Sequence, residues 1–241
     1  IVNDIRKEDK MQIFGFNKTT LLDFPEHVAC TVFTGGCNFI CPFCQNGDLV
    51  LHGGSLPVLD EEEVFGVLRK RKGILTGVCV TGGEPTLQRD LDVFLSRVKE
   101  LGYLVKLDSN GYRPEVLQSL CERGLVDYFA MDIKSSPENY ARTAGVKELD
   151  MGLIRESVDF IRSCGLDYEF RTTVVRELHS PGDFLSIGEW LKGCKAYFLQ
   201  SYVESEGVIC KEFSSYSKEE LEEFVMLLKP YIDNVSLRGV D

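Results

Sequence analysis

The sequence lacks both a long hydrophobic run and an excess of positive charge. No uninterrupted apolar stretch approaches the roughly 18 residues of a membrane span, so we do not expect a membrane protein. The chain carries 27 Lys and Arg against 38 Asp and Glu, a formal net charge of −11. This balance disfavours a nucleic-acid-binding protein, because affinity for phosphate backbones comes mainly from Lys and Arg.

The first ten residues also lack the apolar centre of a secretory signal. They start at Ile1, and Met11 is a more plausible beginning, so residues 1–10 are expected to be an extension or a cloning remnant. A cytoplasmic location follows as an expectation. In such a reducing compartment the nine cysteines are more often metal ligands, catalytic groups or buried apolar residues than disulfides, and their odd number argues against complete pairing.

No linker rich in Pro, Gly or Ser interrupts the chain, which favours one domain over residues 11–241. Strand-like apolar runs are expected at residues 28–33, 77–81, 103–108, 126–133, 166–175 and 196–203, with a final strand at 234–239. Helical periodicity alternates with them at residues 59–72, 88–101, 153–164 and 183–191, from Pro114 and from Ser217. This alternation predicts parallel strands with crossover helices. Six such units are fewer than the eight of a closed barrel, so the predicted fold is α/β, a partial (β/α)6 barrel of parallel strands with outer helices; a doubly wound sheet is the alternative.

What the sequence does have is three cysteines in one short loop. The segment TGGCNFICPFCQN, residues 34–46, follows the first predicted strand and carries Cys37, Cys41 and Cys44. Parallel α/β proteins place ligands at this end of their strands. A structural zinc ion needs a fourth ligand, for which His52 is the nearest candidate, but the spacing fits none of the usual finger patterns. Three thiolates suit a 4Fe–4S cluster that leaves one iron open to another ligand.

Polar motifs close the next strands at the same expected edge of the sheet. They are TGGEP at 81–85, LDSNG at 107–111 and MDIK at 131–134. Each has a plain structural reading, because Gly-Gly and Asp-Ser-Asn-Gly are ordinary turn sequences, and Asp132, Lys134 and Arg171 can form an ion-pair network. Burying unpaired charge is costly, so a ligand with a carboxylate and a cationic group is the other way to partner these side chains.

The cysteine spacing C-x3-C-x-aromatic-C, with Phe43 as the aromatic residue, resembles the cluster motif of the radical S-adenosylmethionine (SAM) enzymes. TGGEP, LDSNG, MDIK and the strand arginine resemble further motifs of that family. Within it, the flank FGFNKTTLLDFPEHVACTVF is similar to the activating proteins of glycyl-radical enzymes, above all those of anaerobic ribonucleoside-triphosphate reductase. Gln45, Ile40 and Glu26 depart from the activase pattern, which more often has histidine, arginine and glycine there.

The resemblance implies one 4Fe–4S cluster on Cys37, Cys41 and Cys44, a SAM site, and a monovalent cation near Asp108. The residues implied at the SAM site are Phe43, Gly82, Gly83, Glu84, Asp108, Ser109, Asp132, Lys134 and Arg171. Weaker candidates are Gln200 and Tyr202, which stand in for a histidine that some activases direct at SAM. Lys18, Thr19, Thr20 and Asp23 are candidates for facing the substrate. No side chain is assigned as a catalytic acid or base.

The implied reaction is reductive cleavage of SAM, followed by abstraction of hydrogen from a backbone glycine of a partner enzyme. The implied partners are a glycyl-radical enzyme, namely anaerobic ribonucleotide reductase, and flavodoxin or ferredoxin as electron donor. One alternative keeps radical SAM chemistry but acts on a small molecule, a peptide or an RNA base. A second is a non-catalytic iron–sulfur carrier or a zinc protein.

Overall fold

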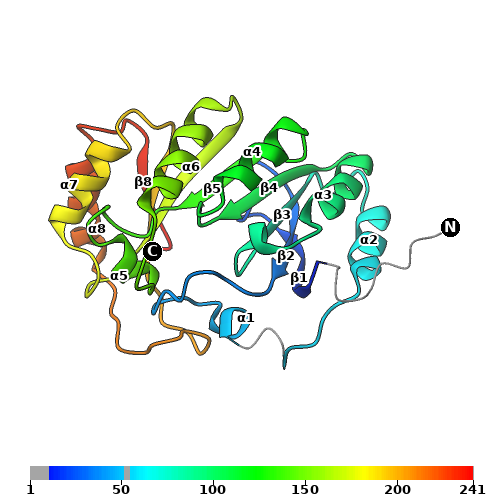
Figure 1. The fold of residues 1–241 in the computed structure, drawn as a ribbon, viewed down its shortest axis with the longest axis horizontal. Helices are drawn as coiled ribbons and strands as arrows, with labels where there is room; N and C mark the ends of the chain where they lie inside the picture. Colours follow the sequence, from blue (N-terminus) through cyan, green and yellow to red (C-terminus); the bar gives the residue numbers. More distant parts are fainter. Residues whose placement is uncertain (1–10, 52–54, 241) are drawn as a thin grey trace. The chain divides into compact units, whose positions relative to one another are not determined.

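The computed structural model describes residues 11–51 and 55–240, so the predicted extension at 1–10 and the candidate zinc ligand His52 lie outside the described residues. The strands are β1 Ile13–Thr20, β2 Ala29–Thr34, β3 Gly77–Gly82, β4 Leu104–Ser109, β5 Tyr128–Asp132, β6 Asp167–Val174, β7 Tyr197–Ser201 and β8 Val235–Arg238. The order of hydrogen-bonded neighbours follows the sequence, from β1 to β8, and Figure 1 labels each strand. The fold is therefore α/β with an open, mostly parallel sheet, as predicted.

Helices follow most of the strands. They are α1 Gly47–Leu51, α2 Glu61–Lys70, α3 Leu91–Glu100, α4 Pro114–Glu122, α5 Tyr140–Ala144, α6 Met151–Ser163, α7 Pro181–Trp190 and α8 Lys218–Leu228, with a 3-10 turn, η3, at Pro85–Leu87. Within the described residues, none of these helices is long and apolar enough to cross a membrane. The described chain divides into two compact units, the first within residues 11–38, 48–51, 55–109 and 113–129 and the second within residues 39–47, 110–112 and 130–240.

The first unit is built on strands β1 to β4 and helices α2 to α4. Strands β2, β3 and β4 pair in parallel, and β1 pairs antiparallel with β2. Helix α2 begins at Asp60, whose side chain accepts from the backbone N–H of Glu62, and it buries Val64, Phe65 and Leu68. Apolar residues at this spacing face the sheet, so the core lies between the helices and the buried strand residues.

The second unit is built on β6, β7 and β8, which pair in parallel, and on helices α5 to α8. Residue Ile133, just after β5, donates its N–H to Arg171 O of β6 at 2.8 Å. Ser180 begins α7 and Ser217 begins α8, each in a capping box that satisfies the free N–H groups of the first turn. These caps fix the loops that precede both helices.

The six predicted strands are confirmed as β2 to β7, and the final strand is confirmed as β8. Strand β1 was not predicted, because Gly15 and the polar run Asn17 to Thr19 interrupt its apolar alternation. The short helices α1 and α5 were not predicted either, because they are too brief for a helical period to emerge.

Candidate functional site

The cysteine loop contributes Cys41 and Cys44 to the second unit, where they form a tight turn. The backbone N–H of Cys44 donates to Cys41 O at 2.9 Å. Burial raises the pKa of the Cys41 thiol to about 11, although the nearby Lys134 ammonium acts in the opposite direction. Burial also raises the pKa of Cys44. The two thiols therefore lie in a water-poor setting close to a lysine that stabilises their thiolate forms.

A segment after β7, residues 203–210, runs along this loop in the same unit. Gln45 Nε2 donates to Val203 O at 2.8 Å. Three backbone hydrogen bonds accompany it, namely Ile209 N to Cys44 O at 3.3 Å, Cys210 N to Pro42 O at 2.9 Å and Gly47 N to Gly207 O at 3.0 Å. Gln45, the departure from the activase pattern beside Cys44, thus ties the cysteine loop to residues 203–210.

In the first unit the glycines of TGGEP lie against the chain that leads into Cys37. Gly83 donates its N–H to Thr34 O at 2.9 Å. A Cβ on Gly83 would lie 2.0 Å from Gly36 O, and Gly82 has φ +118°, a conformation that L side chains rarely adopt. The two glycines therefore permit the end of β3 to approach the residues just before Cys37.

Glu84 completes this motif with a buried carboxylate, 1% exposed. Its backbone N–H donates to Gly36 O at 2.8 Å. Its Oε1 accepts from the Thr86 backbone N–H at 3.1 Å, from Thr86 Oγ1 at 2.6 Å and from Ser109 Oγ at 2.9 Å. The carboxylate thus connects the TGGEP turn to the LDSNG turn, and two of the predicted site residues meet directly.

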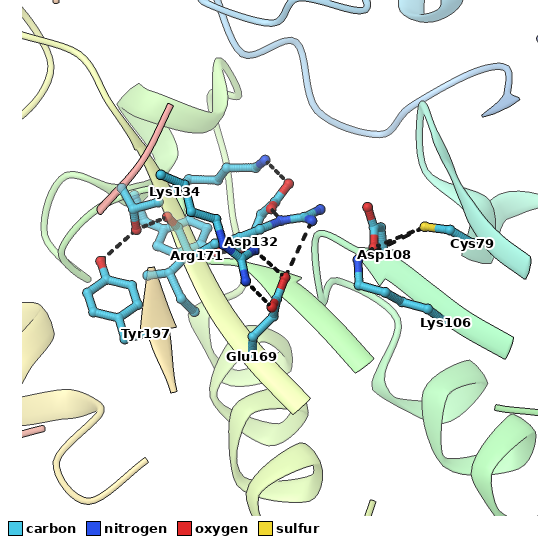
Figure 2. Close-up of polar contacts among 12 residues, drawn as sticks. Cys79, Lys106, Asp108, Asp132, Lys134, Glu169, Arg171 and Tyr197 are labelled. Atoms are coloured by element: carbon cyan, nitrogen blue, oxygen red, sulfur yellow. Dashed lines mark hydrogen bonds and ion pairs between the residues drawn. The ribbon is translucent and has the colours of Figure 1, made fainter. Parts of the chain in front are cut away.

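Asp132, Lys134 and Arg171 meet in the second unit, as Figure 2 shows. Arg171 Nε donates to Asp132 Oδ1 at 2.5 Å, and Lys134 Nζ donates to Asp132 Oδ2 at 2.9 Å. Burial opposes the ionisation of Asp132, but the attraction of Arg171 and Lys134 outweighs it and holds the pKa of Asp132 well below its usual range. The same attraction raises the pKa of Lys134 against the effect of burial. Asp132 and Lys134 are therefore both charged at neutral pH.

This ion-pair chain continues through two residues that were not predicted as site residues, Glu169 and Arg238. Glu169 is 1% exposed, and Arg238 donates to both of its carboxylate oxygens, at 2.8 and 2.7 Å. Arg171 Nη1 lies 3.9 Å from Glu169 Oε1, and the Arg238 guanidinium lies over the Phe198 ring at 3.4 Å. The signal for Glu169 was its place two residues before Arg171 in an apolar strand, which puts both on one face.

The loop after β5, which follows Lys134, is held by residues at the start of α7. His179 Nε2 lies 2.8 Å from Lys134 O, and burial lowers the pKa of His179, which favours its neutral form. Asp183 accepts from Ser136 Oγ at 2.6 Å and from Asn139 Nδ2 at 2.7 Å. These contacts fix the backbone that carries Lys134, and nothing in the strand pattern alone indicated them.

Three further candidates lie in the second unit. Phe43 is buried, and Gln200 lies partly buried on β7. Tyr202 is buried, and its hydroxyl is one of the few buried side-chain atoms in the described part of the chain that have no hydrogen-bond partner; Ser135 Oγ, next to Lys134, is another. Buried polar atoms without a partner are rare, so these two hydroxyls distinguish this part of the second unit.

The candidates for facing the substrate lie where β1 ends and the turn to β2 begins. They are Lys18, Thr19, Thr20 and Asp23. Thr20 Oγ1 accepts from the Asp23 backbone N–H at 3.3 Å, which organises the turn. Between them Leu21 and Leu22 are 72% and 89% exposed.

The donor chemistry fits an iron–sulfur cluster. Cys37, Cys41 and Cys44 lie in one loop and form no disulfide, and thiolates are the ligands such clusters prefer. Among the described residues no three His, Cys, Asp or Glu side chains already converge as a metal site. Cys37 belongs to the first unit and the other two to the second. The fit therefore rests on the thiol ligands, on their spacing and on the lysine beside Cys41.

An open, mostly parallel α/β sheet with a three-cysteine loop after its first parallel strand defines a class of cofactor-dependent enzymes. The sequence pattern of the Radical SAM superfamily matches residues 31–181. The chain belongs to the radical SAM superfamily.

Two relatives illustrate the range of similar sequences. A Methanocaldococcus jannaschii protein, provisionally named a glycyl-radical enzyme activating enzyme, is 30% identical over 240 residues, which cover 96% of this chain and 98% of the relative. The 7-carboxy-7-deazaguanine synthase of Thermococcus kodakarensis is 36% identical over 107 residues, 44% of this chain and 39% of that protein.

Solved structures agree on the fold alone. Streptococcus suis SuiB superposes with a TM-score of 0.67 at 16% identity, over 85% of this chain and 47% of SuiB. Coproporphyrinogen III oxidase from Escherichia coli, a radical SAM enzyme, gives a TM-score of 0.59 at 15% identity, over 87% of this chain and 54% of that enzyme. This chain thus spans about half the length of these structural neighbours.

Proposed function

We propose that the chain is an activase that cleaves SAM and generates a glycyl radical on a partner enzyme, anaerobic ribonucleoside-triphosphate reductase. The likeness to the Methanocaldococcus jannaschii protein carries this proposal, because it extends over nearly the whole of both chains. The flank KTTLLDFP, which resembles the activases, supports the same reaction.

The proposed ligands of one 4Fe–4S cluster are Cys37, Cys41 and Cys44. When bound, such a cluster supplies the electron for cleavage of SAM to methionine and a carbon radical that takes hydrogen from a glycine. The protein's contribution is to bind, orient and exclude water. Burial of Cys41 and Cys44 limits solvent access to the thiolates, and Lys134 favours their deprotonated state.

The ion-pair chain of side chains in the second unit is the proposed site for the carboxylate of SAM. Its members are Lys134, Asp132, Arg171, Glu169 and Arg238, three cations and two anions. Arg171 donates a hydrogen bond from Nε to Asp132. The planar fork of its guanidinium group suits a second carboxylate, which is proposed to be that of SAM. The glycines Gly82 and Gly83 are proposed to give a ligand amino group access to backbone carbonyls, in keeping with the close backbone approach at this turn.

The turn after β1 is the proposed contact with the partner enzyme. Leu21 and Leu22 expose apolar side chains beside Lys18 and Thr19, and exposed pairs of large apolar residues are typical of protein contacts. Flavodoxin or ferredoxin is the proposed electron donor.

One observation favours a second candidate, a radical SAM enzyme that acts on a small molecule. The 36% identity to 7-carboxy-7-deazaguanine synthase supports it, but that match covers only 39% of the relative. A small-molecule enzyme would turn over without any protein partner, whereas an activase requires one.

The test is to reconstitute the protein anaerobically with iron and sulfide, reduce it, add SAM and measure 5′-deoxyadenosine and methionine. We expect both products, and their loss in Cys44→Ser. Lys218→Ser at the exposed start of α8 is the matched control and should retain activity. A protein that binds zinc, or that holds a cluster without cleaving SAM, contradicts the proposal.

A further inference from the structure

Strand β4 carries a buried lysine directly beside Asp108. Lys106 is 2% exposed, and its Nζ donates to Asp108 Oδ1 at 2.5 Å (Figure 2). The two residues are two apart in a strand, so their side chains lie on the same face of the sheet. Cys79 Sγ of the neighbouring strand also lies close, 4.0 Å from Lys106 Nζ and 3.8 Å from Asp108 Oδ1.

Such a lysine is costly to bury, and the cost is met only when a carboxylate lies close to it. An ammonium group is a compact single positive charge that can donate to an oxygen. In size and charge it is close to a potassium ion, and a carboxylate oxygen is a preferred ligand for both. The position beside Asp108 where the family resemblance predicts a monovalent cation therefore already holds a cation that belongs to the chain.

We propose that the Lys106 ammonium replaces the monovalent metal ion at this site, so that the protein needs no added cation to hold Asp108 in place. The inference rests on the proposed SAM site, because it is there that a cation is expected. The neighbouring residue Ser109 donates to Glu84 Oε1 at 2.9 Å, so the Asp108–Ser109 segment is fixed on both sides. A tethered ammonium keeps this segment ordered at any salt composition, whereas a metal ion holds it only when bound.

Thermal melting of the full chain in potassium, sodium or tetramethylammonium chloride at equal ionic strength tests the inference. We expect the wild type to melt at the same temperature in all three salts. Lys106→Met leaves a buried carboxylate without its ammonium, and should lower the melting temperature by about 6–20 °C for a chain of this size. Potassium or sodium, but not the bulky tetramethylammonium ion, should recover part of that loss.

Two further variants make the result specific. In Lys106→Met/Asp108→Asn the carboxylate is gone, so the response to potassium should disappear. Lys99→Met removes a lysine from a partly exposed pair with Asp127, and should shift melting by less and without cation specificity.

The affinity of the cluster-loaded wild type for SAM supplies a second readout, which holds even if Lys106→Met fails to fold. The affinity of the wild type for SAM should be the same in potassium chloride and in tetramethylammonium chloride. Saturable, potassium-specific gains in wild-type melting temperature or SAM affinity overturn the inference, as does a folded Lys106→Met protein with no cation response. Thermal melting requires neither cluster nor SAM. The melting experiments therefore test the role of Lys106 even if a lack of SAM cleavage disproves the proposed reaction.

Discussion

Replacement of Gly83 by alanine is the sharpest test of how the TGGEP turn supports the cysteine loop. The new Cβ would lie 2.0 Å from Gly36 O and 2.7 Å from Gly36 C, far closer than real contacts allow. Both atoms are backbone, so no flexible side chain can move aside. We expect a loss of about 1–3 kcal/mol in the free energy of unfolding. For a chain of this length that loss lowers the melting temperature by roughly 2–12 °C.

The strain falls on the residue directly before Cys37, so iron incorporation should fall as well. The assays are thermal melting and the iron and sulfide content per chain after anaerobic reconstitution. Gly66→Ala is the matched control, because Gly66 lies inside α2 and a Cβ there meets no atom within 4 Å. It should stabilise the helix by about 0.8–1 kcal/mol. If Gly83→Ala melts like the wild type and takes up the same iron, the argument from close packing is wrong.

Three further predictions follow from the ion-pair chain, the buried histidine and the exposed turn. The pKa of His179 is lower in the folded than in the unfolded chain, so the free energy of unfolding should fall as pH drops below about 6.5 toward the folded-state pKa. Urea unfolding at a series of pH values measures this, and in His179→Gln the free energy should change less over that range. Arg238→Lys keeps the positive charge but loses the two parallel hydrogen bonds to Glu169, which leaves Arg171 misplaced. SAM should then bind about tenfold more weakly, with kcat at saturating SAM unchanged. An unchanged affinity in calorimetry refutes this. Leu22→Ser should reduce glycyl-radical formation but leave SAM cleavage in the absence of the partner intact. Met226→Ser, at another exposed apolar site, should alter neither.

Much of the site could be predicted from short-range patterns. In or directly after three successive strands, oppositely charged residues stand two apart, namely Lys106 with Asp108, Asp132 with Lys134 and Glu169 with Arg171. Strand alternation puts Lys106 and Asp108 on one face, and likewise Glu169 and Arg171. The cost of burial requires partners, so paired charges were foreseeable within each unit. The strand ends that carry TGGEP, LDSNG and MDIK were also located correctly.

The remaining contacts depend on residues far apart in the chain, which no local pattern specifies. Arg238 reaches Glu169 across 69 positions, and Gln45 reaches Val203 across 158. The monovalent cation beside Asp108 stays a prediction, and the proposal that Lys106 takes its place depends on a buried ion pair that the motif LDSNG does not itself contain. Backbone approach also escaped sequence reasoning, since Gly-Gly indicates a turn but not what lies against it.

The most direct test of the central claim is electron paramagnetic resonance on a mixture of the reduced, cluster-loaded protein, SAM and anaerobic ribonucleoside-triphosphate reductase. The account predicts a glycyl-radical signal on the reductase, lost in Cys41→Ser, together with an equivalent amount of 5′-deoxyadenosine. SAM cleavage that proceeds without any radical on the reductase or on another glycyl-radical enzyme would contradict it.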